Sequence, residues 1–217
     1  MTDGPLSLPA RLCLLAWDSA CPPAADAGRL AGLVRAGALT ELAQRGLLID
    51  DDGIATPVDL DARAGDAVLD GLLELVHESC PHSWRTWVTL RARVTLDAVR
   101  EQLVAGGYLR AEKKRVLGVF PSVDHALERG TAVEALREET RRILRGPSPV
   151  AKTSWRDAAL VALAAAADLL PEQDVRAHER RVEELTERAG AMAPGLRRIV
   201  REVLGAVAAE PGAPARA

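Results

Sequence analysis

Hydrophobic positions along the chain alternate with polar ones in a pattern that predicts a series of helices. Leu, Ala and Val recur at helical spacing, and glycine or proline ends most of the segments. An apolar stretch at residues 6–17 comes first, and the longer predicted helices cover residues 27–45, 65–79, 96–106, 133–144, 155–170, 175–189 and 196–208. Asp66 stands at the start of one of them as an N-cap or first-turn acid.

Two helices are each followed by a glycine and a short hairpin. Residues 47–49 and 54–58 flank an Asp-Asp-Asp-Gly turn at 50–53, and residues 107–110 and 116–120 flank a turn placed at Lys113 and Lys114. The two units match at one constant offset, with Leu42, Gly46 and Leu48 corresponding to Leu103, Gly107 and Leu109. The expected fold class is therefore mostly α: a single globular helical domain with small β-hairpins over residues 1–209, followed by a disordered tail at 210–217.

Composition fits a helical protein of the bacterial cytoplasm. Of the 217 residues 48% are hydrophobic, but only six are aromatic, so Leu, Ala and Val must form the core. No apolar run approaches the ~18 residues that a membrane span needs. Cys13, Cys21 and Cys80 include no C-x-x-C pair and no cleavable signal pattern precedes them, which indicates a reduced compartment. Only three of the 28 basic residues are lysine, as expected of a GC-rich bacterial genome.

The charge is distributed unevenly. Residues 1–80 hold five arginines against 13 acids, residues 81–160 hold 15 basic residues against nine acids, and residues 161–217 hold eight against nine. A basic middle in a nearly neutral chain suits a face that meets an anion, such as a nucleic acid, a membrane surface or a phosphorylated ligand. Solvated helix faces that pair with the acidic first segment would give the same pattern.

Motifs for catalysis are missing from the sequence. It contains no G-x-S-x-G, phosphate loop, G-x-G-x-x-G or H-E-x-x-H. His77, Cys80 and His82 are the one metal-like cluster, but Pro81 breaks their helical spacing and no second group of ligands completes a zinc site. We therefore expect a protein that is not an enzyme and holds neither a metal nor a cofactor.

A helix followed by a hairpin is also typical of a winged helix. The basic run Lys113, Lys114 and Arg115 would suit a wing that contacts DNA. The other hairpin carries three aspartates at its tip, which would repel phosphate. A nucleic-acid-binding regulator is thus an alternative, although nucleic acid is not the expected partner.

An ordered series of short motifs runs along most of the chain. The most recognisable block, at residues 33–46, reads LVRAGALTELAQRG. The others are LCLLAWD at 12–18, GDAVLD at 65–70, Trp87, VAGGYL at 104–109 and VLGVFP at 116–121. In their order and spacing these motifs resemble the Golgi phosphoprotein 3 family, in its bacterial branch, over roughly residues 6–208.

The resemblance implies a helical peripheral membrane protein that binds phosphatidylinositol 4-phosphate in a pocket of one tryptophan and several arginines. Arg35 matches the arginine of the long block, and Arg93 matches a second pocket arginine. Leu96 stands where the next arginine is expected and Asp26 stands near the tryptophan position, with Arg29 close by. The sequence therefore leaves the identity of the lipid open.

Two further features of the family have counterparts here. Val116 and Leu117 match apolar hairpin positions that imply membrane contact and self-association. Arg91 lies close enough to Arg93 to join the headgroup site, since converging guanidinium groups bind phosphate through paired hydrogen bonds. Arg35 could instead be a helix arginine paired with an acid, Arg91 and Arg93 could mark a solvated helix start, and residues 116–120 could be a strand packed on the core.

The leading hypothesis from sequence is a non-enzymatic, cytoplasmic peripheral membrane protein. Its expected partners are anionic phospholipid headgroups and the membrane surface, with a homo-oligomer as a further expectation. The alternatives are the nucleic-acid-binding regulator and a structural adaptor without lipid specificity.

Overall fold

The computed structural model describes residues 6–17, 27–59, 61–116, 120–191, 197, 201, 204 and 205. Over these ranges the chain forms helices and two separate antiparallel hairpins, which confirms the mostly α fold class. The elements are α1 (Leu8–Leu15), α2 (Ala27–Gln44), β1 (Leu48–Asp51), β2 (Ile54–Pro57), α3 (Ala67–Glu78), α4 (Trp84–Thr89), α5 (Ala92–Ala105), β3 (Leu109–Val116), β4 (Phe120–Leu127), α6 (Gly130–Arg145), the 3₁₀ helix η1 (Val150–Lys152), α7 (Trp155–Ala166), α8 (Glu172–Ala177) and α9 (Glu179–Ala189).

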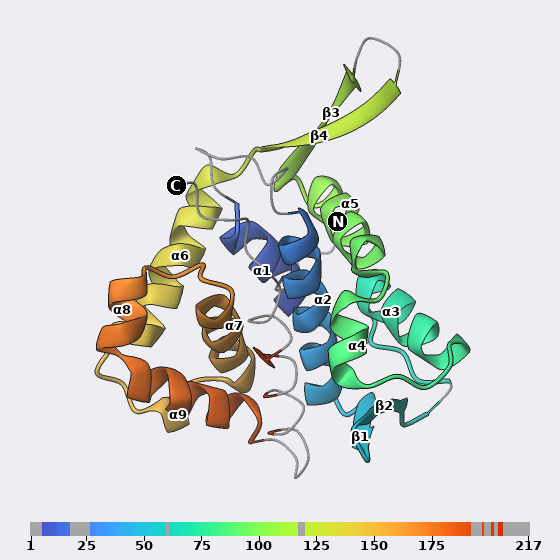
Figure 1. Ribbon diagram of the computed structural model, residues 1–217. Coiled ribbons are helices and arrows are strands. Elements are labelled where there is room, and N and C mark those ends of the chain that lie inside the picture. Colours follow the sequence, from blue (N-terminus) through green and yellow to red (C-terminus); the bar gives the residue numbers. More distant parts are fainter. Residues whose placement is uncertain are drawn as a thin grey trace, which may run out of the picture.

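Helix α2 is the centre of the fold. Every residue from 30 to 44 is buried, and α2 packs against α1, α3, α4, α5 and α7. Figure 1 shows α3, α4 and α5 on one side of it and α6 to α9 on the other. A Cβ at Gly37 would lie only 2.5 Å from Leu12 Cδ1, so the absence of a side chain there allows α1 to approach α2 closely.

A buried carboxylate ties three of the central helices together. Glu41 of α2 has no exposed surface. Its Oε2 accepts a hydrogen bond from the Leu8 amide at 2.6 Å, at the first turn of α1. Its Oε1 lies 2.5 Å from Arg45 Nη2 and 2.8 Å from Arg156 Nη2 of α7. Two guanidinium groups and one backbone amide thus compensate the buried carboxylate.

Local signals correctly placed several helix ends. Asp66 caps α3, accepting from the amides of Val68 and Leu69 at 3.0 and 3.1 Å. Gly46 and Gly107 both have positive φ, 71° and 69°, and each is followed by an amide that bonds back to the fifth preceding carbonyl. The two helix-glycine-hairpin units predicted from sequence thus share the same backbone termination.

Other boundaries differ from the prediction. Helix α4 was missed because six residues are too few for a clear period, and α5 begins at Ala92 rather than near residue 96. The segment predicted at 155–170 ends as a helix at Ala166, and residues 175–189 fall in two helices that meet at His178. The predicted helix at 196–208 falls mostly outside the described residues, as does the tail at 210–217.

The turn predicted at Lys113 and Lys114 is wrong. Both residues lie within β3, which pairs with β4 from Leu109 opposite Leu127 to Val116 opposite Phe120. The hairpin therefore continues past the basic run, and Figure 1 shows it projecting from the helical body rather than packing across the core. Of the hairpin side chains that the structure describes only Leu109, at the base, is buried, so the sequence lacks the alternation that would have marked its length.

Candidate anion-binding site

Arg35 is a cation buried inside the protein. It lies on α2 with no exposed surface, and its Nη2 donates to the backbone carbonyl of Arg91 at 2.7 Å. Its Nε and Nη1 have no acceptor among the described residues, and no described carboxylate forms an ion pair with it. Burial lowers the pKa of the guanidinium to about 10, so Arg35 is still charged at neutral pH. The salt-bridged helix arginine considered from sequence is not what this part of the structure contains.

The acceptor for Arg35 lies at a sharp junction between α4 and α5. Arg91 has φ 52° and ψ 29°, in the left-handed region, and α5 begins at the next residue. Its side chain is exposed while its carbonyl accepts from both Val94 N, at 3.0 Å, and Arg35. No side chain caps the N-terminus of α5 and its first turn holds no acid, so the positive end of the helix dipole faces this junction.

Basic side chains surround the junction. Residues 79–96 contain Arg85, Arg91 and Arg93 and no aspartate or glutamate, and all three arginines are exposed. Val94, which follows Arg93 in the sequence, is 61% exposed. We call the exposed side chains of Arg91, Arg93 and Val94, at the start of α5, the α4–α5 corner. It combines positive charge with an accessible apolar group beside the carbonyl that Arg35 contacts.

Arg29 is held in a different place. It precedes Arg35 by six residues on α2, a rotation of about 240° around the helix. Its Nη2 lies 2.5 Å from a carboxylate oxygen of Asp168, just after α7. The structure thus brings Arg35 to the junction that carries Arg91 and Arg93, and engages Arg29 with another element. Leu96 is a core residue with 2% exposure, and Asp26 lies outside the described residues.

The hairpin residues are only partly described. Val116 closes β3 opposite Phe120, and Leu117 lies outside the described residues. The hairpin that carries them extends away from the core (Figure 1).

The residues considered as a metal site do not come together. Cys80 is exposed after α3, and the ring of His82 packs edge-on against buried Trp87 with centroids 5.3 Å apart. Within the described ranges no group of three or more His, Cys, Asp or Glu side chains is arranged to hold an ion.

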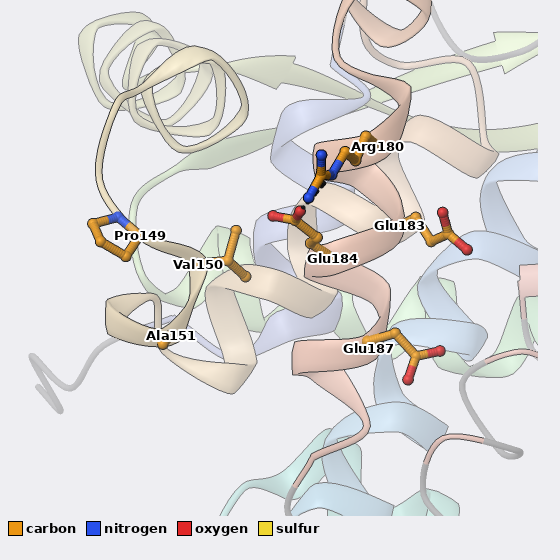
Figure 2. Close-up of a pocket in the computed structure, with 7 residues that line it drawn as sticks. All are labelled: Pro149, Val150, Ala151, Arg180, Glu183, Glu184 and Glu187. Carbon is orange, nitrogen blue, oxygen red and sulfur yellow. Dashed lines mark hydrogen bonds and ion pairs between the residues drawn. The ribbon is translucent and has the colours of Figure 1, made fainter.

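A shallow pocket of about 640 Å³ lies between η1 and α9. Figure 2 shows an apolar edge from the η1 segment facing the charged side chains of α9. Arg180 pairs with Glu184 at 3.0 Å, and the pocket also contains Glu183 and Glu187. An anion would be repelled by this excess of carboxylates, so this pocket is not a candidate for the headgroup site.

Sequence reasoning missed the features that organise the junction. Nothing in the residue types around Arg91 indicates a left-handed conformation, because glycine and asparagine are its usual markers. Asp50, expected at a solvated hairpin tip, accepts a hydrogen bond from Trp84 Nε1 at 2.8 Å and so connects β1 to α4. Because 34 residues separate Asp50 from Trp84, no local sequence signal indicated this contact.

The architecture defines a class of mostly helical domain with a buried central helix, a projecting hairpin and a buried arginine beside a basic corner. The family model described as Golgi phosphoprotein 3 (GPP34) matches residues 8–203, and the chain belongs to this family. None of the curated proteins compared matches the chain. Among the described residues no helix has the length and hydropathy required to cross a bilayer.

Proposed function

We propose that the protein is a non-enzymatic peripheral membrane protein of the cytoplasm that binds anionic lipid headgroups at the α4–α5 corner. Membership of the Golgi phosphoprotein 3 family is consistent with this role. We expect weak discrimination among anionic lipids, because Asp26 and Leu96 stand at sequence positions where the family resemblance implies a tryptophan and an arginine.

The observation that carries the proposal is the buried guanidinium of Arg35. A buried charge is stable only when other charges or hydrogen bonds compensate it. Within the described part of the chain Arg35 has one hydrogen bond and two donor nitrogens without an acceptor. A phosphate group seated at the corner would supply the opposite charge. It would also supply the missing acceptors once the side chains that cover Arg35 move aside, because Arg35 has no exposed surface. An apolar side chain would cost less free energy to bury at this position than an arginine does. A buried arginine is therefore better explained by a ligand than by stability.

The exposed parts of the corner support the same ligand. Arg91 and Arg93 can contact headgroup oxygens directly, and Val94 can enter the interfacial region between headgroups. Each basic residue near an anionic bilayer contributes about 1 kcal/mol of attraction. The projecting hairpin, with Lys113, Lys114 and Arg115 in its sequence, offers a second basic contact with the same surface.

Vesicle co-sedimentation tests the proposal. The wild-type protein is compared on vesicles of phosphatidylcholine alone and on vesicles that also contain phosphatidylglycerol or phosphatidylinositol 4-phosphate. Arg35→Met and Arg93→Gln should each weaken binding by roughly tenfold or more, the equivalent of one charge-assisted hydrogen bond. Arg180→Gln is the matched control, because it removes one positive charge from a side chain that is 91% exposed on α9.

Equal losses for Arg93→Gln and Arg180→Gln would mean diffuse surface attraction and would overturn the specific site. A parallel binding assay with duplex DNA tests the nucleic-acid alternative. The affinity of a groove that contacts many phosphates falls much more steeply with salt concentration than the affinity of a headgroup site does. If the protein binds no anionic vesicle, the proposed function is refuted and the structural adaptor without lipid specificity is the hypothesis that stands.

A further inference from the structure

Arg91 has a backbone conformation that its side chain does not favour. Three described residues other than glycine have positive φ: Asp52 at 48°, Asp168 at 55° and Arg91 at 52°. Aspartate is among the residue types enriched in the left-handed region, because its short polar side chain bonds locally. Arginine has no such compensation, so the surrounding structure must hold Arg91 in place.

The side chain and the backbone carbonyl of Arg91 face different surroundings. Its guanidinium is exposed at the α4–α5 corner, while its carbonyl accepts from Arg35 Nη2 at 2.7 Å. That carbonyl is the acceptor of the one hydrogen bond that Arg35 makes within the described part of the chain. The Arg91 carbonyl belongs to the first turn of α5, where it also accepts from Val94 N. In the extended or right-handed regions α5 would leave α4 in another direction, so this carbonyl would shift relative to α2 and Arg35.

We infer that Arg91 is a positioning residue that acts through its main chain. The left-handed turn sets the direction in which α5 leaves α4, and this places the carbonyl at the start of α5 against Arg35. The carbonyl orients the guanidinium of Arg35, and this orientation leaves Nε and Nη1 of Arg35 for the anion. The exposed guanidinium of Arg91 adds only general attraction to the surface. The inference rests on the proposed function, because it assigns the anion to Arg35.

Two neutral substitutions separate the main-chain role from the charge. Arg91→Asn and Arg91→Val both remove the guanidinium, but asparagine adopts the left-handed region readily and a β-branched residue does not. On phosphatidylinositol 4-phosphate vesicles, Arg91→Asn should bind about fivefold more weakly than the wild type, the effect of one surface charge. Arg91→Val should bind at least tenfold more weakly than Arg91→Asn. Circular dichroism and the thermal midpoint establish that the variants are folded at the assay temperature.

A loss of stability alone is excluded by a second variant. Asp52→Val places the same unfavourable residue at a left-handed position in the β1–β2 turn, so it should lower the thermal midpoint and leave vesicle binding unchanged. If Arg91→Val does not fold, Arg91→Ala replaces it, because alanine is disfavoured in the left-handed region without being branched. Arg91→Ala should still bind several-fold more weakly than Arg91→Asn.

The Arg35→Met background completes the test. In that background Arg91→Asn and Arg91→Val should bind the vesicles equally, since the Arg91 carbonyl no longer has a guanidinium to orient. Equal binding of the two variants in the wild-type background would overturn the inference, and so would a difference that persists without Arg35. Failure of the proposed function gives a different result, in which Arg35→Met itself leaves vesicle binding unchanged.

Discussion

Replacing Arg35 with methionine is expected to stabilise the folded protein while it removes most of the affinity for anionic vesicles. Methionine is unbranched and apolar, so it fits the same buried path on α2 without bringing a charge. Lowering the pKa of the guanidinium from 12.5 to about 10 corresponds to about 3 kcal/mol of unfavourable burial. The substitution also removes the hydrogen bond to the Arg91 carbonyl, worth ~1 kcal/mol net. That carbonyl retains the Val94 amide as a donor, so no buried acceptor is left unpaired.

The expected net effect is a gain of about 2 kcal/mol in the free energy of unfolding, or roughly 4–8 °C in the thermal midpoint. Urea unfolding at pH 7 measures it. The folded-state pKa of this base lies below its unfolded value, so the cost of burial is fully present below pH 10 and is relieved as pH rises toward 12.5. The whole gain should therefore be visible at neutral pH. A loss of 1 kcal/mol or more would refute the reasoning, because it would mean that the guanidinium is compensated in the folded protein.

Three other substitutions test separate parts of the structure. Glu41→Gln leaves two buried or half-buried arginines without their carboxylate and should cost about 3–5 kcal/mol in urea unfolding; a cost below 1 kcal/mol would show that the network contributes little. Burial raises the pKa of the Cys13 thiol to about 12, so thiol labelling of the native protein at pH 8 should be unchanged in Cys13→Ala and reduced by one equivalent in Cys80→Ala. The double variant Val116→Asp, Leu117→Asp should weaken vesicle binding or self-association, measured by co-sedimentation and light scattering, without a change in thermal midpoint. Unfolding of that variant would mean that these side chains belong to the core.

Local sequence signals were sufficient where a structure depends on neighbouring residues. Asp66 predicts the start of α3 because its side chain reaches amides two and three residues away. Gly46 and Gly107 predict helix ends because only a residue without a Cβ adopts positive φ at no steric cost. The order of the family motifs is also a property of the sequence alone, and it was enough to identify the family, which the match over residues 8–203 shows.

Only the tertiary structure decided what those arginines contact. Arg35 meets the carbonyl of a residue 56 positions away, at a junction where Arg91 adopts a left-handed conformation unusual for arginine. Arg29, which the family resemblance places close to the tryptophan position of the same pocket, pairs with Asp168, 139 positions away. Such pairings depend on how whole helices pack around α2, and the packing energy outweighs the local preference of one residue. Periodicity and capping are short-range properties of the chain, whereas the depth at which a charge is buried is a property of the assembled core.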